Sequence, residues 1–278
     1  MRNRFTGAGQ EVSAALTAGK KLPTQMTGAL SQICDQAFKK RVRIFIDAEQ
    51  QSVQHGINQI ALDLMRKYNV GRATVYNTYQ AYLRDTPATV AAHMSQASEE
   101  GFTLGAKLVR GAYMKSEPRH LIHHNKQNTD DCYDNLAHAI LQKRPEAFWK
   151  DQYPTKPFPS VELFLATHNK NSAMSANDVQ NSRAQSGASL VPLSYGQLLG
   201  MADEVSCSLL QLRSKNGSNH APPSVYKCLS WGSLSDCISY LLRRAVENRD
   251  AVGRTVAERN GLRREVFRRL KTVLGGNK

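Results

Sequence analysis

The 278-residue sequence lacks several features that mark whole classes of protein. It has no uninterrupted apolar run of about 18 residues, which argues against a transmembrane helix. Its five cysteines form no Cys-x-x-Cys pair, so neither a disulfide framework nor a structural zinc site is predicted. No charged and then apolar leader precedes a small-residue cleavage site, so we expect no secretory signal and a reducing compartment.

The signature motifs of several enzyme classes are missing as well. Gly7-Ala-Gly9 lacks the third glycine of a dinucleotide-binding fingerprint, and the sequence contains no P-loop and no Gly-x-Ser-x-Gly motif. His120 and His123 have metal-ligand spacing, but no general-base glutamate accompanies them as in a metalloprotease helix. We therefore predict no metal site and no protein nucleophile.

Acidic residues are scarce relative to basic ones: 37 Lys and Arg face 23 Asp and Glu, which gives a formal net charge of +14. Much of the excess lies after residue 240, where residues 248–274 are predicted to form a basic amphipathic helix. Residues 253–278 are predicted to form a separate basic C-terminal helix or tail. Its apolar stripe is expected to pack on the body of the protein. Contact with an anionic membrane surface is the alternative, and nucleic acid is not expected because no RNP-type strand accompanies the charge.

Short β-type runs alternate with helical stretches along most of the chain. The runs are residues 43–46, 73–76, 106–110 and 161–166, with weaker ones at 195–201 and 225–229. Strands that alternate with helices indicate parallel βα units, so either a (β/α)8 barrel or an open doubly wound sheet is predicted. We count about six strands, fewer than a complete barrel has.

Polar residues follow these runs at their C-terminal ends, namely Asp47, Gln80, Lys107, Arg110 and His168. In a barrel such residues meet at one mouth, where ligand sites collect. Together they predict a site for an anionic ligand, although each alone is more often structural.

A second cluster is predicted on one helical face, formed by Tyr240, Arg243, Arg244 and Glu247. Paired guanidinium groups match a carboxylate or a phosphate. An exposed salt bridge between Arg243 and Glu247 would give the same pattern.

Several of these segments occur in an order that resembles one known family. They are Ile46-Asp-Ala-Glu49, Tyr79-Gln-Ala-Tyr82, Lys107-Leu-Val-Arg-Gly-Ala-Tyr113, Ala166-Thr-His-Asn169, Gln197-Leu-Leu-Gly-Met201 and Tyr240-Leu-Leu-Arg-Arg-Ala-Val-Glu-Asn248. From about Arg4 to Val252 the chain resembles the FAD-dependent proline dehydrogenases, and the eukaryotic, fungal branch in particular. The resemblance implies a distorted (β/α)8 TIM-like barrel over residues 1–252. It also implies oxidation of L-proline to pyrroline-5-carboxylate, with electrons passed to a quinone at the matrix side of the mitochondrial inner membrane.

The resemblance further implies roles for individual residues. Arg243 and Arg244 would hold the proline carboxylate, with Glu247 beside them. Tyr240 and Leu198 would line the substrate pocket, and Asp47 would join a polar network with Arg4. Lys107 would lie near flavin N5. The remaining FAD-binding residues implied are Gln80, Arg110, Gly111, Ala112, Thr167, His168 and Asn169.

The sequence departs from the family pattern at three places. The chain begins inside what resembles the second strand, so we expect a barrel without its first strand or strands. Arg4 stands where the family usually has Lys, which keeps the charge but changes the shape. Cys228 stands where a Tyr commonly contacts the proline ring, which predicts weaker proline binding or tolerance of a hydroxylated proline. A catalytically inactive relative that binds flavin or proline weakly is the alternative.

Overall fold

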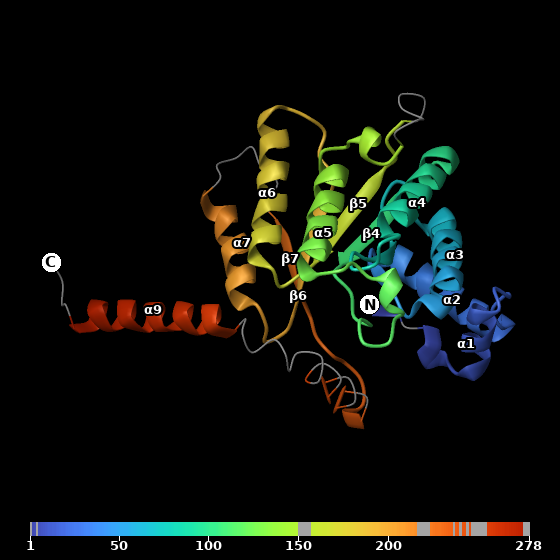
Figure 1. Cartoon of the computed structure of the whole chain (residues 1–278), viewed down its shortest axis with the longest axis horizontal. Helices are drawn as coiled ribbons and strands as arrows, with labels where there is room; N and C mark the ends of the chain where they lie inside the picture. Colours follow the sequence, from blue (N-terminus) through green and yellow to red (C-terminus); the bar gives the residue numbers. More distant parts are fainter. Residues whose placement is uncertain are drawn as a thin grey trace.

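The computed structural model describes residues 2–3, 5–149, 157–215, 223–235, 237–238, 241–242, 245 and 255–274 (Figure 1). The strands are β1 (Arg2–Asn3), β2 (Ile44–Ile46), β3 (Val75–Gln80), β4 (Leu104–Val109), β5 (Val161–Ala166), β6 (Leu193–Leu198) and β7 (Ser224–Cys228). The helices are α1 (Gln10–Thr17), α2 (Thr24–Lys39), α3 (Gln51–Tyr68), α4 (Thr86–Glu100), α5 (Lys126–Leu141), α6 (Lys170–Gln185), α7 (Asp203–Lys215) and α9 (Thr255–Leu274). Short 3-10 turns lie at η1 (Phe5–Ala8), η2 (Arg119–Leu121) and η3 (Pro145–Ala147).

The strands form one parallel sheet whose spatial order, β1 to β7, equals the chain order. A doubly wound sheet reverses its strand order at a switch point, so that alternative is excluded. Within the described ranges, β1 pairs with β2 alone and β7 with β6 alone. The result is a curled, open sheet of the distorted TIM-like kind. The six predicted strands are confirmed, and the two-residue β1 adds a seventh.

The curl of the sheet follows from contacts between strands that are not neighbours. The rings of Phe45 on β2 and Phe164 on β5 have centroids 4.6 Å apart, although β3 and β4 lie between these strands. The Tyr76 ring joins them, with its centroid 5.0 Å from that of Phe45. A flat sheet would hold β2 and β5 about 14 Å apart at the usual strand spacing. The concave face therefore has a small aromatic core of its own.

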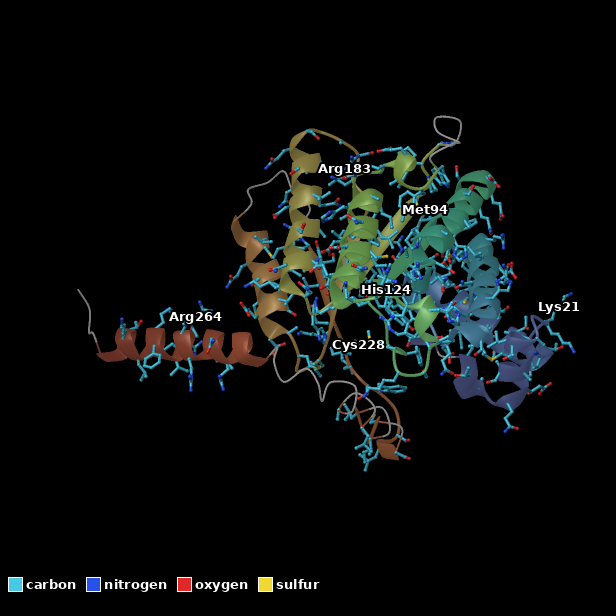
Figure 2. All side chains as sticks on the ribbon, in the orientation of Figure 1. Lys21, Met94, His124, Arg183, Cys228 and Arg264 are labelled. Carbon is cyan, nitrogen blue, oxygen red and sulfur yellow. The ribbon has the colours of Figure 1, made fainter. Side chains whose placement is uncertain are left out.

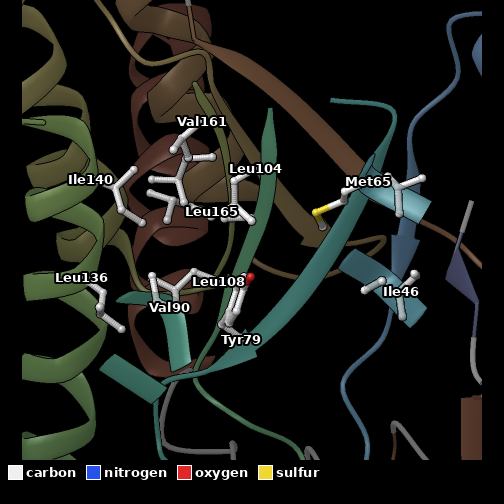
Figure 3. Packing of buried hydrophobic residues seen from close by; sticks show 14 of the residues in the cluster. Ile46, Met65, Tyr79, Val90, Leu104, Leu108, Leu136, Ile140, Val161 and Leu165 are labelled. Carbon is white, nitrogen blue, oxygen red and sulfur yellow. The ribbon is translucent and has the colours of Figure 1, made fainter. Parts of the chain in front are cut away.

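The main hydrophobic core lies between the convex face of the sheet and the surrounding helices (Figures 2 and 3). Alternate residues of one strand, such as Val161, Leu163 and Leu165, point to this side, as the period of two in a strand requires. Ile140 of α5 packs in the same cluster. The helices are held over the sheet by this burial, which leaves the strand ends to carry polar groups.

Two helices of the sheet's outer layer begin at asparagine caps. The Asn169 side chain accepts a hydrogen bond from Ser172 N at 3.2 Å, directly after β5. The Asn125 side chain accepts one from Asn128 N at 2.8 Å at the start of α5. These caps satisfy N–H groups that a helix N-terminus otherwise leaves unpaired. They set where α5 and α6 meet the carboxyl edge of the sheet.

Buried polar contacts lock the amino-terminal ends of the strands. Asn69 is fully buried, and its Nδ2 donates to the carbonyls of Val75 and Thr103, both at 2.8 Å. Its Oδ1 accepts from the backbone N–H groups of Thr74 and Val75 at 2.9 and 2.8 Å. One side chain thus ties the loop after α3 to the starts of β3 and β4.

A network of charged and polar side chains links the strands at their amino-terminal ends. Arg43 donates to Ser194 Oγ at 2.8 Å and lies 3.8 Å from Glu162. The Glu162 carboxylate also accepts hydrogen bonds from Tyr76 OH and from Ala73 N. Burial, together with the Glu162 charge, raises the pKa of Tyr76 far above its ordinary value.

The helix predicted over residues 248–274 is confirmed as α9 over Thr255–Leu274, and its earlier residues lie outside the described ranges. The expectation that its apolar stripe packs on the body is wrong. Leu262, Val266 and Leu270 are 68%, 54% and 48% exposed, and Figure 1 shows α9 extending away from the sheet. Arg259 and Arg263 fall on the same arc of the helix, so docking the stripe would bury two guanidinium groups. No helix in the described part of the chain is long and apolar enough to cross a membrane.

Candidate functional site

The candidate site lies at the carboxyl edge of the sheet, where polar side chains follow β2, β3, β4 and β5. Parallel strands bring these ends to one side of the molecule. The curl of the sheet then lets side chains from non-adjacent strands meet. At this edge Asp47 contacts Lys107, Gln80 contacts Ala112 and Arg110 contacts Thr167. That these groups form one ligand site stays a prediction.

Lys107 and Asp47 form an ion pair across the mouth of the curled sheet. Lys107 Nζ lies 2.8 Å from Asp47 Oδ1, and the two side chains are 7% and 17% exposed. β3 lies between their strands, so the ion pair spans two strand spacings. The ammonium also lies 5.8 Å from the centroid of the Phe45 ring. A cation with so little solvent around it acts strongly on a neighbouring ligand, because little water screens it.

Gln80 is held in one orientation at the end of β3. Its Nε2 donates to the carbonyl of Glu49 at 3.2 Å, and its Oε1 accepts from Ala112 N at 3.2 Å. The buried Glu49 is fixed in turn, because its carboxylate accepts hydrogen bonds from the N–H and hydroxyl of Thr6. The Gln80 amide is thus positioned before any ligand arrives.

Gly111 allows the loop after β4 to pass against an aromatic ring. Its φ is +147°, and a Cβ built there would lie 1.8 Å from Cδ1 of Tyr82. Any other residue would force the loop and the ring apart. The glycine therefore fixes the position of Ala112, whose N–H reaches Gln80.

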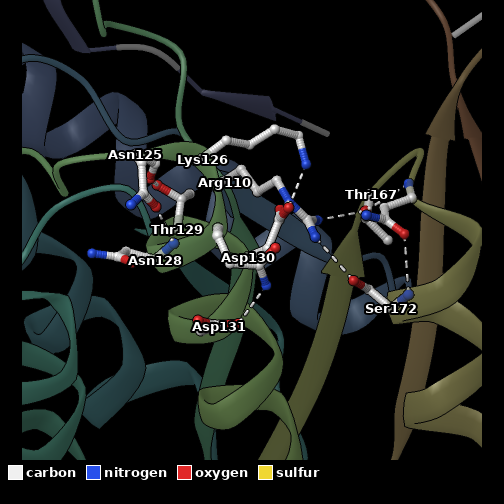
Figure 4. Close-up of polar contacts among 11 residues, drawn as sticks. Arg110, Asn125, Lys126, Asn128, Thr129, Asp130, Asp131, Thr167 and Ser172 are labelled. Atoms are coloured by element: carbon white, nitrogen blue, oxygen red, sulfur yellow. Dashed lines mark hydrogen bonds and ion pairs between the residues drawn. The ribbon is translucent and has the colours of Figure 1, made fainter.

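Arg110 is the centre of a polar cluster at the ends of β4 and β5 (Figure 4). Its Nε donates to Asp130 Oδ1 at 2.5 Å, and its two terminal nitrogens donate to Thr167 Oγ1 at 3.0 Å and Ser172 Oγ at 2.9 Å. The guanidinium carbon lies 4.4 Å from the centroid of the Tyr133 ring. The cluster places a fixed cation beside the N-terminus of α6, which itself favours an anion.

His168 and the residues beside it join β5 to β6. His168 Nε2 accepts a hydrogen bond from Leu198 N at 3.1 Å, and Asn169 N donates to Thr167 Oγ1 at 3.0 Å. Leu198 is the register partner of Cys228 on β7. The structure thus places Leu198 and Cys228 side by side on adjacent strands, as their predicted shared pocket requires.

Five predicted site residues lie outside the described residues: Arg4, Tyr240, Arg243, Arg244 and Glu247. The pairing predicted between Asp47 and Arg4 therefore also lies outside the described residues. Among the described residues, Asp47 pairs with Lys107.

The sequence predicted no role in this site for Asp130, Tyr133 or Ser172. These residues reach Arg110 from α5 and α6, many residues away in the chain. The cap residues Asn125 and Asn169 are the local signals by which the starts of these two helices could have been found.

Comparison with known proteins places these features in a family. A family model described as proline dehydrogenase matches residues 3–257. A Schizosaccharomyces pombe protein named probable proline dehydrogenase, mitochondrial, is 35% identical over 245 residues, 85% of this chain and 49% of that protein. The human proline dehydrogenase 1, mitochondrial, is 30% identical and covers 97% of this chain and 43% of its own length.

A hydroxyproline dehydrogenase from Xenopus laevis is 32% identical over 87% of this chain and 49% of its own length. The chain therefore spans about half, or less, of the length of these relatives. Among solved structures, proline utilization A from Bdellovibrio bacteriovorus superposes with a TM-score of 0.67 at 20% identity, over 89% of this chain and 24% of that one. This likeness supports the fold.

Proposed function

Because the chain belongs to the proline dehydrogenase family, we propose that it oxidises L-proline to pyrroline-5-carboxylate with FAD as the cofactor. The observation that carries the proposal is the buried Lys107–Asp47 pair at the mouth of the curled sheet, flanked by the fixed Gln80 amide. The mouth of such a sheet is where barrel enzymes hold their reacting groups.

The donors at the carboxyl edge fit a flavin dinucleotide. The Gln80 amide, which the Ala112 N–H holds in place, and the Lys107 ammonium would suit the polar edge of an isoalloxazine ring. Arg110 and the N-terminus of α6 suit a phosphate. Thr167, His168 and Asn169 follow β5 at the same edge, where Thr167 contacts Arg110 and Asn169 caps α6. When bound, FAD supplies the two-electron acceptor that no side chain of this sequence provides.

The protein's own residues would bind and orient the substrate. By resemblance, Arg243 and Arg244 hold the proline carboxylate, because guanidinium forks match carboxylates. Tyr240 and Leu198 cover the ring, and Glu247 and Arg4 complete the polar wall. Lys107 places positive charge where the ring system gains electrons, and Asp47 holds the ammonium in place. No protein nucleophile is needed for this reaction.

By the same family membership we propose a mitochondrial location, with a membrane quinone as the final electron acceptor. The support is that relatives from fungi and animals carry mitochondrial names.

A visible absorption spectrum of the full chain, before and after anaerobic L-proline, tests the proposed activity. Flavin absorption that bleaches with proline is expected. If the chain takes up no added FAD, or if bound flavin stays oxidised in excess proline, the proposal is wrong. In either case the catalytically inactive relative becomes the better assignment.

A hydroxylated proline is the second candidate substrate. Two observations favour it: hydroxyproline dehydrogenases are 32% and 33% identical to the chain, and Cys228 leaves more room beside Leu198 than a tyrosine would. Turnover of trans-4-hydroxy-L-proline and L-proline by the same preparation distinguishes the candidates. A kcat/KM for hydroxyproline at least equal to that for proline would favour the second one.

A further inference from the structure

Three structural elements hold the guanidinium of Arg110. Asp130 of α5 accepts from Nε, while Thr167 after β5 and Ser172 of α6 accept from the terminal nitrogens. The Tyr133 ring covers one face, with its centroid 4.4 Å from the guanidinium carbon. A guanidinium carries more N–H donors than these contacts use, so it can hold an anion while remaining held itself.

Asp130 is the charged member of this frame, and its side chain is 12% exposed. Burial alone would raise its pKa, but hydrogen bonds from Lys126 and Arg110 outweigh burial, so the pKa lies below its ordinary value. The carboxylate is therefore ionised at neutral pH. It binds Nε, the nitrogen on the side chain's own stem, and so turns the terminal nitrogens towards β5 and α6.

We propose that Asp130 is a positioning residue that fixes Arg110 for the phosphate groups of the dinucleotide. The inference rests on the proposed function, since it concerns the same cofactor. In this arrangement an acidic residue, Asp130, strengthens the binding of an anion. A bidentate contact with a phosphate depends on where the two terminal nitrogens of the guanidinium point. Asp130, Thr167 and Ser172 fix that direction before the phosphate binds.

The sign of the effect separates positioning from simple charge balance. If Asp130 mattered only as a charge, Asp130→Asn would tighten FAD binding, because a negative group near the phosphates is removed. Lys126→Gln would then weaken it. If Asp130 positions Arg110, Asp130→Asn weakens FAD binding while Lys126→Gln leaves it nearly unchanged. The Lys126 side chain is 77% exposed, so its charge is well screened.

The test measures dissociation constants of FAD and of riboflavin, which has no phosphate, for the full-length chain and its variants. We expect Asp130→Asn to weaken FAD binding about tenfold, the usual size of one charge-assisted contact. Riboflavin binding should stay within about twofold, because the ring-binding residues lie elsewhere. Asp131→Asn is the matched control: Asp131 is exposed and accepts from Gln127 of the same helix at 2.7 Å.

The outcomes separate this inference from the proposed function. If the wild-type chain binds neither flavin, the proposed function fails first. If the wild type binds FAD and Asp130→Asn binds it equally or more tightly, the positioning role is wrong. An equal loss for FAD and riboflavin would show a general structural defect and would also overturn it. Should Asp130→Asn not fold, Asp130→Glu, which keeps the charge but displaces it, is expected to show the same selective loss of FAD affinity.

Discussion

The two ends of the curled sheet hold similar kinds of side chain for different purposes. At the amino-terminal end, Arg43 donates to the Ser194 hydroxyl, and Glu162 accepts from the Tyr76 hydroxyl and the Ala73 N–H. Asn69 uses both ends of its amide there. At the carboxyl end, Lys107 and Asp47 pair at the open mouth. The first set joins neighbouring strands, and the second set lies where the proposed function puts the ligand.

Buried polar side chains occur at both ends of the sheet, so burial of a polar group does not by itself identify a ligand site. The contacts at the amino-terminal end stabilise the fold, because breaking one of them leaves a buried polar group without a hydrogen-bond partner. Chemistry requires groups that are fixed yet face the mouth, where barrel enzymes collect their catalytic residues. Substitutions at the two ends should therefore move different measurements.

The largest expected effect is at the carboxyl end. Lys107→Met should lower proline turnover about 10²- to 10³-fold, the usual cost of losing one well-placed electrostatic contact. Lys107→Arg should retain much of the activity, because it keeps the charge. Turnover at saturating FAD and proline is the measurement, with urea unfolding as the check on folding. Turnover of Lys107→Met within threefold of wild type would contradict the assignment.

At the amino-terminal end, Asn69→Ala should cost about 2–4 kcal/mol of unfolding free energy, because two carbonyls and two N–H groups lose their buried partner. FAD affinity of the folded protein should not change. Urea denaturation and flavin titration together give both numbers. If Asn69→Ala lost FAD affinity without losing stability, the separation of a stabilising end from a ligand-binding end would be wrong.

A smaller effect is expected for Glu162→Gln, about 1–2 kcal/mol of unfolding free energy. The amide keeps an acceptor for Ala73 N, but the charge that faces Arg43 is lost. The control is Glu146→Gln, because Glu146 pairs with Arg144 at an exposed, solvent-screened position and its loss should leave stability nearly unchanged. Equal changes in the two variants would mean that the inner network adds nothing to stability.

The smallest effect concerns selectivity at the mouth. Cys228→Tyr should restore aromatic cover and shift the ratio of proline to hydroxyproline kcat/KM by about tenfold towards proline. An added ring fills the space beside Leu198, which the register places next to Cys228. Identical ratios in the variant and the wild type would show that this position does not decide the substrate.

The sequence predicted most strands and helices because their signals are local. The strand β5 is a short, nearly continuous apolar run over 161–166 with Glu162 as its one charged residue. The helix α4 begins at a Thr-Pro pair and is followed by Gly101, whose φ is +76°. The position of α9 against the body was predicted wrongly, because amphipathic spacing shows an apolar stripe but not whether a partner surface exists. The roles of Tyr240, Arg243 and Arg244 stay predictions, since these residues lie outside the described ones.

By itself the sequence determined the parallel βα order, the family and the set of polar residues that end the strands. These depend on residue types and on spacings of a few positions. Only the tertiary structure decided which of those residues meet. The pairing of Lys107 with Asp47 and the frame of Asp130, Thr167 and Ser172 around Arg110 join elements far apart in the chain. These contacts depend on how the curled sheet and the helices pack together, and local sequence patterns do not predict that packing.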